Sequence, residues 1–407
     1  MIKTGKEPMK VMTFIAILAV CFVINLPGIA VAPIEGKLMR TLGTSELEIQ
    51  LLTTLPNFVI IPFVFLSGKL SDYRHKMPLI VISLLLFAGC GVGYLFAESM
   101  TVLIILSCLL GAADGILIPF AMGFVVNSFE GKYRTRNLGF KSATSNLGTV
   151  IASFVVGYLI EGENWHTPFA VYLIVIVPLV LSWWLQYVPG FGKKSVLPAA
   201  YQCQEGNVGK DLDSGKIWSL ICNNVSVTFI TFSIVLYLPQ LIEGYNWSPS
   251  VSGDVIGVFF IAVLSSGFVL EYFLKGFKSL VFPILGLCLF IGLGLISFFK
   301  AEWAMYVESI FAGFAFGIFQ PLIYDKTSYA INNPRKNIFG LSLVLTALYI
   351  AIAVEPFVIT GIVKLFKIHD ENHFVFQLSF YLSIAYILIS FIFRKKFAFS
   401  ISPNYYS

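Results

Sequence analysis

Long apolar runs recur along the whole chain, and this pattern restricts the possible folds more than any other feature of the sequence. A helix that crosses the hydrocarbon core of a bilayer needs about 20 consecutive, mostly apolar residues. The chain supplies such runs repeatedly, with charged or turn-forming breaks between them. We predict twelve transmembrane helices, at residues 10–33, 46–68, 77–97, 101–127, 137–160, 167–188, 216–240, 251–274, 279–299, 302–324, 337–363 and 373–393.

The composition and the pattern together point to helices in a membrane. Only 12% of the residues are charged, whereas soluble domains carry about 25% charged residues. A membrane β-barrel would show strands of about ten residues with alternating polarity, and the apolar runs here do not alternate. The predicted fold class is therefore an all-α membrane protein.

The basic residues predict how the chain is oriented. Loops rich in Lys and Arg stay on the cytoplasmic side of a membrane. If the N-terminus is inside, the basic residues on the outer side are Lys37, Arg40, Lys300, Lys364 and Lys367. We therefore predict a multi-pass protein of a bacterial-type inner (plasma) membrane with both termini in the cytoplasm. Because the basic residues are scattered over helix ends, the net charge of +5 requires no nucleic-acid partner.

The longest polar interruption divides six predicted helices from six. We expect an N-terminal six-helix half at 1–188, a cytoplasmic linker at 189–215 and a C-terminal six-helix half at 216–407. The fourth and tenth predicted helices align without a gap, as Ser107-x3-Gly111-x3-Gly115-x3-Pro119 and Ser309-x3-Gly313-x3-Gly317-x3-Pro321. Small residues at every fourth position let another helix approach closely. The two halves should therefore be pseudo-symmetric, as in many secondary transporters.

A weaker repeat and a loop motif lie at the end of the second predicted helix. The spacing Gly68-x3-Asp72-x3-Lys76 recurs as Gly267-x3-Glu271-x3-Lys275. The segment Gly68-Lys69-Leu70-Ser71-Asp72-Tyr73-Arg74-His75-Lys76 resembles the loop signature of the major facilitator superfamily, Gly-x-Leu-x-Asp-Arg-x-Gly-Arg-Lys. The resemblance implies a latch that breaks and re-forms during transport, made by Gly68, Asp72, Arg74 and Lys76. The alternative is a solvated basic turn that only fixes the topology.

Within that superfamily the chain is loosely similar to twelve-span drug/proton antiporters, which implies proton-coupled export. Two positions depart from their pattern. Ser107 stands where these antiporters carry an Arg, and Ala152-Ser153 replaces the Gly-Pro of their fifth span, although Gly148 and Gly157 are kept. Both departures count against proton-coupled export, and the missing Gly-Pro favours an uptake system instead.

Three acidic residues fall within predicted spans, where a charge costs roughly 2.5–3.5 kcal/mol on insertion scales. Asp114 lies about halfway through the fourth span, Glu308 near the outer end of the tenth and Glu355, before Pro356, in the outer half of the eleventh. Buried carboxyls tend to be protonated, which suits proton exchange or attraction of a cationic substrate. Each could also be a structural group that bonds a neighbouring helix.

Several amide side chains also fall within predicted spans and could bind a sugar or a peptide, or simply join helices. These candidates are Asn25, Asn57, Asn146, Asn223, Asn224 and Gln320. The leading hypothesis is a secondary active transporter that exports lipophilic neutral or cationic compounds by alternating access coupled to protons. The alternative is proton- or ion-coupled uptake of a sugar, nucleoside or peptide-like nutrient, and a third class is a membrane receptor or scaffold.

An enzyme is the class that the sequence favours least. The chain has no Gly-x4-Gly-Lys-Ser/Thr phosphate loop and no His-Glu-x-x-His motif, and its six cysteines show no CxxC pairing. We therefore expect no cofactor and no metal. The expected partners are a small-molecule substrate, protons and the lipid bilayer, with no nucleic acid, and one chain containing both halves is expected to work as a monomer.

Overall fold

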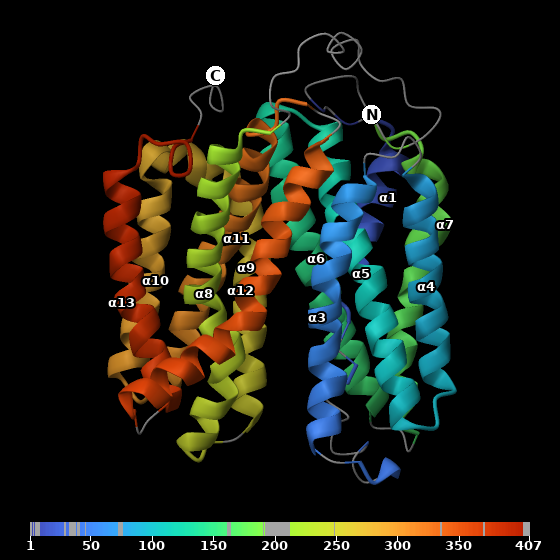
Figure 1. The fold of residues 1–407 in the computed structure, drawn as a ribbon, viewed down its shortest axis with the longest axis horizontal. Coiled ribbons are helices and arrows are strands. Elements are labelled where there is room, and N and C mark those ends of the chain that lie inside the picture. The colour runs from blue at the N-terminus through green and yellow to red at the C-terminus, as the bar shows by residue number, and fades with distance from the viewer. Residues whose placement is uncertain are drawn as a thin grey trace. The chain divides into compact units, whose positions relative to one another are not determined.

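The computed structural model describes residues 9–27, 46–71, 76–160, 164–189, 212–247, 249–333, 336–368 and 371–401, with residues 2, 4, 30, 31, 38, 41–44 and 191 besides. These residues are almost entirely helical (Figure 1). The α-helices are α1 (Val11–Val23), α3 (Glu46–Leu70), α4 (Met77–Leu95), α5 (Met100–Ser128), α6 (Gly131–Ile160), α7 (Ile176–Leu185), α8 (Ser214–Gly244), α9 (Pro249–Phe277), α10 (Val281–Phe298), α11 (Glu302–Tyr329), α12 (Asn337–Phe366) and α13 (Glu371–Ile392). Two 3-10 helices, η2 (Thr167–Val175) and η4 (Lys278–Leu280), lead directly into α7 and α10.

Every predicted span falls on a helix, and the helices have the character of membrane spans. Within the described residues, 8 helical stretches are long and apolar enough to cross a bilayer, and one of them, Gly253–Phe298, spans most of α9 and all of α10. Shorter apolar helices are Val11–Val23 and Thr54–Leu70. The prediction of an all-helical membrane fold therefore agrees with the structure.

The first predicted span is too long. The structure ends α1 at Val23, and Asn25 adopts a left-handed backbone conformation with φ 75°. Asparagine tolerates this conformation better than most residues, and Pro27, two residues later, has no N–H for a continuing helix. Asn25 is thus an exposed turn residue and not, as predicted, a polar residue within a span.

Two predicted spans are shorter than the helices that the structure shows, because the prediction ended them at charged residues. The fifth and tenth predicted helices stop at charged residues, but α6 begins at Gly131 and α11 continues to Tyr329. Charged side chains at a membrane boundary do not interrupt the backbone hydrogen bonds of a helix. The extension of α11 brings Lys326 into the helix, and this lysine is 7% exposed.

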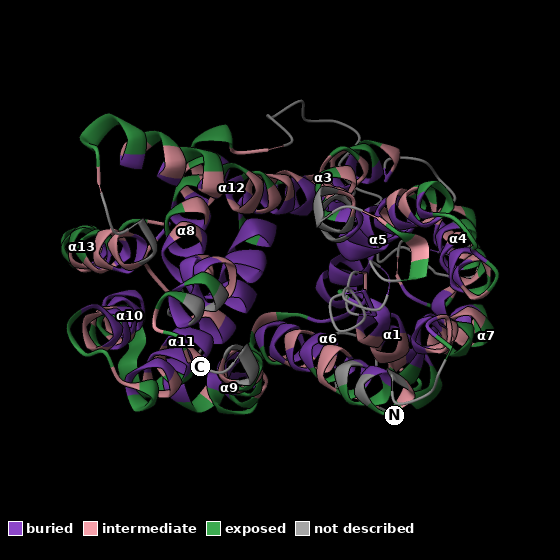
Figure 2. Cartoon of the chain, turned by 90° about the horizontal axis from the view of Figure 1, so that it is seen from below, coloured by how far each residue is buried: buried purple, intermediate pink, exposed green. Residues whose placement is uncertain are grey.

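The described chain forms two compact units. Unit 1 contains residues 1–134, 144–212 and 331–349, and unit 2 contains residues 135–143, 213–330 and 350–407. The start of α6 groups with unit 2 and the start of α12 with unit 1. In each unit, buried residues face neighbouring helices and exposed residues face outward (Figure 2).

In unit 1, α5 packs against α3 through its stripe of small residues. A Cβ atom on Gly111 would lie 2.6 Å from the carbonyl oxygen of Pro56, and one on Gly115 would lie 2.8 Å from that of Ile60. The hydroxyl of Ser107 donates to the Leu52 carbonyl of α3 at 2.8 Å. The close helix approach predicted from the spacing is confirmed here.

In unit 2, α11 packs against α9 in the same way. A Cβ atom on Gly317 would lie 2.8 Å from the carbonyl oxygen of Val263, and one on Gly313 would collide with the carbonyl oxygen of Phe259. The two aligned sequence stripes therefore serve equivalent helix pairs. This equivalence supports the internal repeat that the spacing predicts.

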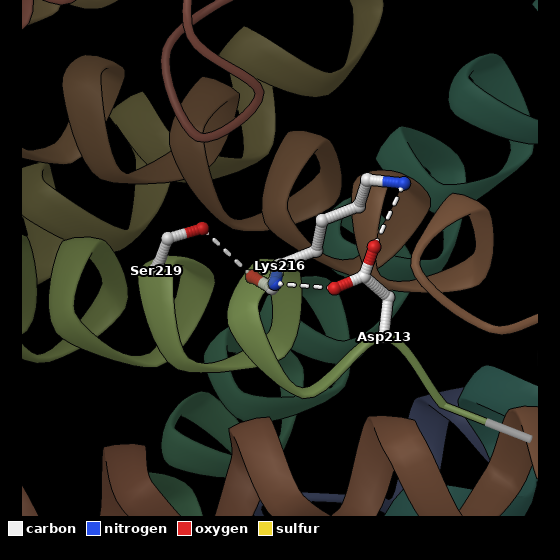
Figure 3. A network of polar contacts seen from close by, with 3 residues as sticks. All are labelled: Asp213, Lys216 and Ser219. Atoms are coloured by element: carbon white, nitrogen blue, oxygen red, sulfur yellow. Dashed lines mark hydrogen bonds and ion pairs between the residues drawn. The ribbon is translucent and has the colours of Figure 1, made fainter. Parts of the chain in front are cut away.

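The helix α8 begins at the end of the predicted linker, and a side chain caps its first turn. The Oδ1 atom of Asp213 accepts from the backbone N–H of Lys216 at 3.1 Å, and its Oδ2 pairs with the Lys216 ammonium at 3.0 Å (Figure 3). The neighbouring Lys216 holds the pKa of Asp213 below its ordinary value. Asp213 is thus the N-cap of α8. Most of the predicted linker, residues 190 and 192–211, lies outside the described residues.

Candidate functional site

The three predicted acids are all buried in their helices. Asp114 of α5 lies in unit 1 and is 1% exposed, whereas Glu308 of α11 and Glu355 of α12 lie in unit 2 and are 1% and 0% exposed. Asp114 interacts with other groups of the chain. The structure therefore places each acid where a charge would be removed from water.

Glu355 is the least satisfied of the three acids. In the described part of the chain, neither of its carboxyl oxygens has a hydrogen-bond partner. Glu308 also has one such oxygen, Oε2. An ionised carboxylate in this situation loses its hydration without compensation, so the neutral form is favoured.

Three of the predicted amides join helices or chain segments of unit 2. The Asn223 amide donates to the Ala398 carbonyl at 3.1 Å, and its oxygen accepts from the Tyr386 hydroxyl at 2.9 Å. The Gln320 amide donates to the Asn224 oxygen at 3.1 Å, which links α11 to α8. These contacts are those of helix-joining groups, the reading that the sequence left open.

The remaining amides occupy different environments. Asn146 of α6 is buried at 8% exposure, and Asn57 of α3 is exposed. With Asn25 in its turn, the predicted amide set does not form one cluster within either unit. The amides therefore carry less of the candidate site than the acids do.

Polar groups with spare hydrogen-bonding capacity lie between α8 and α11, and the sequence reasoning missed one of them. Asn224 bonds Gln320, and the rings of Phe232 and Phe316 meet with centroids 5.5 Å apart. Thr228 lies four residues from each of these α8 contacts, so it faces α11 too. Its buried hydroxyl and the Oε1 atom of Gln320 have no hydrogen-bond partner in the described chain. The spacing of Asn224 and Thr228 on one helix face was the available signal.

The predicted latch is only partly described. Asp72 and Arg74 lie outside the described residues. Gly68 packs against α12, where an added Cβ would collide with the Ser342 hydroxyl and lie 2.6 Å from its Cβ. The Lys76 ammonium lies 5.4 Å from the centre of the Phe191 ring.

The sequence counterpart of Gly68 lies at a similar helix crossing in unit 2. A Cβ atom on Gly267 of α9 would lie 2.8 Å from the carbonyl oxygen of Gly139 in α6. Each glycine thus joins a helix of one predicted half to a helix of the other. The weaker sequence repeat therefore marks equivalent positions.

Lys326 is a buried cation that the short predicted span concealed. Its ammonium donates to the carbonyl oxygens of Phe397 and Ser400, and it lies 5.3 Å from the centre of the Phe282 ring. The segment after α13 therefore closes one end of unit 2. Carbonyl oxygens and aromatic faces therefore surround this charge.

The sequence was compared with protein families and with known proteins. A family model described as Major Facilitator Superfamily matches residues 13–356. The multidrug transporter protein MdtP of Bacillus subtilis is 28% identical over 183 residues, which are 44% of this chain and 33% of MdtP. The quinolone resistance protein NorA of Staphylococcus aureus is 22% identical over 328 residues, 78% of this chain and 82% of NorA.

Solved structures share the fold at low sequence identity. The proton:xylose symporter XylE bound to 6-bromo-6-deoxy-D-glucose aligns with a TM-score of 0.69 at 14% identity, covering 94% of this chain and 95% of XylE. FucP in the outward conformation aligns with a TM-score of 0.67 at 13% identity, covering 93% of this chain and 98% of FucP. At this identity, the likeness establishes the twelve-helix arrangement and not a substrate.

Proposed function

Because this chain belongs to the Major Facilitator Superfamily, and is therefore a multi-pass membrane transporter of small molecules rather than an enzyme, we propose that it exports lipophilic neutral or cationic compounds in exchange for protons. The observation that carries this proposal is the carboxyl group of Glu355. It is 0% exposed, and both of its oxygens lack a hydrogen-bond partner in the described chain.

Such a group couples proton movement to a change of conformation. In a dry environment the neutral carboxyl is stable, and when water enters the ionised form becomes stable. A proton taken up on one side can therefore be released on the other as the protein alternates between two states. Each proton that moves inward down a potential of 100 mV contributes roughly 2.3 kcal/mol. Glu308 and Asp114 are further proton-binding candidates, because both are buried.

Two relatives support the proposed direction and substrate class. MdtP and NorA carry the names multidrug transporter and quinolone resistance protein. Their similarity to this chain is low, but it favours export of drug-like compounds over uptake of a nutrient. Buried carboxyl groups without partners also suit cationic compounds, since a departing proton leaves a negative charge.

Nutrient uptake remains the alternative, favoured by the absence of Gly-Pro at Ala152-Ser153. It would need polar side chains that are free to bind a sugar, nucleoside or peptide. Asn223 and Asn224 both bond other parts of unit 2. Asn223 and Asn224 therefore give this alternative little support, whereas the Gln320 Oε1 atom and the Thr228 hydroxyl have no partner in the described chain and could bind such a substrate.

The predicted latch completes the proposed cycle. Gly68 and Gly267 allow the close helix crossings at α12 and α6. Asp72 and Arg74, which follow Gly68 in the sequence, would make and break contacts as the halves 1–188 and 216–407 move. In this arrangement the protein lies in a bacterial-type inner membrane as a monomer, with both termini in the cytoplasm.

The test uses everted membrane vesicles with an acidic interior and a pH-sensitive dye. Lipophilic cations, sugars and amino acids are added in turn to vesicles that contain the wild type, Glu355→Gln or Glu302→Gln. Glu302 is the control, because it is an exposed acid in the first turn of α11. We expect lipophilic cations to collapse the gradient in the wild type and the control but not in Glu355→Gln.

Other outcomes separate the parts of the proposal. If Glu355→Gln exchanges protons like the wild type, the proton does not pass through Glu355, and Glu308→Gln and Asp114→Asn are measured in the same way. If no compound collapses the gradient, proton-coupled export is wrong. Uptake of labelled nutrients into right-side-out vesicles then tests the alternative.

A further inference from the structure

His166, which directly precedes η2, joins two segments of unit 1. One ring nitrogen, Nδ1, lies 2.8 Å from the Oδ1 atom of Asn164. The other, Nε2, lies 2.9 Å from the backbone carbonyl oxygen of Ala97, 69 residues away in sequence. The side chain thus ties the segment before η2 to the turn that follows α4.

Both atoms that face the ring are hydrogen-bond acceptors. A backbone carbonyl oxygen can only accept. The orientation of the Asn164 amide is fixed, because its Oδ1 also accepts from the backbone N–H of His166 at 3.0 Å. A neutral imidazole carries one N–H and can therefore make one of these two bonds, whereas the doubly protonated ring makes both.

The ring is held in this position by aromatic packing. The ring centroids of His166 and Trp165 are 3.6 Å apart with an interplanar angle of 27°. Trp165 is buried and contacts Phe169, which stacks on Tyr94 with centroids 4.5 Å apart. The face of an indole attracts a cation. The packing therefore keeps the ring between its two acceptors.

No other charged or titratable group of the described chain forms an ion pair with the His166 ring. Glu98, next to Ala97 in the turn, is exposed, and in the described chain no ion pair joins it to His166. Tyr94 and Tyr172 belong to the aromatic layer around Phe169. Glu161 and Glu163 lie outside the described residues.

His373 of unit 2 also makes a hydrogen bond through its ring, but its partner differs from those of His166. His373 stands at the start of α13 as His166 stands before η2, and its Nδ1 lies 3.2 Å from the hydroxyl oxygen of Tyr245. A hydroxyl group can donate or accept. The bond between His373 and Tyr245 therefore survives in either protonation state, unlike the pair of bonds made by His166.

We propose that His166 is a proton-operated clasp that fastens the turn after α4 to the start of the sixth span. In acid the ring carries two protons and makes both bonds. As the pH rises, the ring loses one proton, one nitrogen faces an oxygen without a hydrogen, and the clasp loosens. On the face that the sequence predicts to be outside, the clasp responds to the pH of the compartment from which protons would enter.

The protonation state is measured directly by ¹⁵N NMR of the full-length protein in lipid nanodiscs with labelled histidine. The chain contains 4 histidines, so the His166→Gln variant assigns the His166 signals by their loss. We expect both ring nitrogens of His166 to carry hydrogen at about pH 6 and only one at about pH 8.5. A neutral His166 ring at about pH 6 would overturn the proposal.

A second measurement follows thermal unfolding over the same pH range. The wild type should lose about 1–2 °C from the loosened clasp. In Asn164→Ala the neutral ring can keep its bond to Ala97, so this loss should disappear, whereas the control His373→Gln should retain it. An Asn164→Ala variant with the wild-type pH dependence contradicts the clasp. Neither measurement requires transport, so failure of the proposed function leaves the test intact.

Discussion

Gly68 of α3 faces a serine side chain of α12, whereas its sequence counterpart, Gly267 of α9, faces the backbone of α6. Each contact joins helices from different predicted halves of the chain. At the first crossing the nearest obstacle to a Cβ atom is the Ser342 side chain, and at the second it is the carbonyl oxygen of Gly139. A side chain can be shortened by mutation but a backbone carbonyl cannot. We therefore call the Gly68 crossing adjustable, because its obstacle is a side chain, and the Gly267 crossing rigid, because its obstacle is backbone.

The largest effect is expected at the rigid crossing. In Gly267→Ala the new methyl group would lie 2.8 Å from the Gly139 carbonyl oxygen and 3.1 Å from the Ala143 Cβ. Overpacking of this kind costs about 1–3 kcal/mol, so transport should fall by about fivefold or more. Transport is measured in vesicles at equal protein content.

Gly257→Ala is the control for this variant, because it adds a methyl group to the same helix with nothing within 4 Å. It should transport like the wild type. If Gly267→Ala does so too, the approach of α9 to α6 is not required for transport.

At the adjustable crossing we expect a defect that can be repaired. Gly68→Ala places a methyl group against Ser342, with a cost of about 1–3 kcal/mol. The double variant with Ser342→Gly removes the obstacle, and the next atom, the Phe339 Cα, lies at an ordinary 3.4 Å. Transport by the double variant should return to within about twofold of the wild type.

Gly89→Ala in α4 serves as the control here, since nothing lies within 4 Å of its added atom. A double variant as defective as Gly68→Ala alone would show that the obstacle is not Ser342. The distinction between an adjustable and a rigid crossing would then be lost.

A smaller effect should follow from a hydrogen bond beside the adjustable crossing. The Asn337 amide at the start of α12 donates to the Asn127 oxygen of α5 at 3.3 Å, within unit 1. Asn337→Ala should destabilise the protein by about 0.5–1.5 kcal/mol. Thermal unfolding of the single variants and of Asn337→Ala with Gly68→Ala measures whether the two contacts are coupled. Strict additivity would mean that the bond lies outside the crossing.

The smallest effect is expected at Asp213, which belongs to neither crossing. Lys216 lowers the pKa of Asp213, so the ionised form stabilises the folded state. This contribution is present above the unfolded-state pKa and is lost as the pH falls through the lower, folded-state pKa. Thermal unfolding should therefore show Asp213→Asn slightly less stable than the wild type near neutral pH, with the difference vanishing in acid. A difference that grows in acid would contradict this sign.

The helices could be predicted from the sequence because burial in a bilayer imposes length and polarity on every span. The ends were less predictable. Asn25 ends α1 through a local backbone conformation that an apolar average does not detect, and Lys326 continues α11 although its charge suggests an end. The glycine stripes were predictable, because the close approach of two helices depends on residue size at fixed spacing.

The candidate site could be predicted only in part. The burial of Glu355 follows from its position in a span, but its lack of hydrogen-bond partners depends on side chains from other helices. Asn223 illustrates the opposite result, since its partner Ala398 lies 175 residues away. No local pattern separates an amide that joins two segments from one that is free to bind a substrate.

The carbonyl groups that hold Lys326 also constrain biosynthesis. Phe397 and Ser400 leave the ribosome long after the lysine that they bind. Until then the ammonium of Lys326 has no carbonyl acceptors from this segment, so unit 2 should finish folding only when residues 397–400 have emerged. Translation that stops shortly before this point should yield an inserted chain that cellular proteases recognise as incomplete.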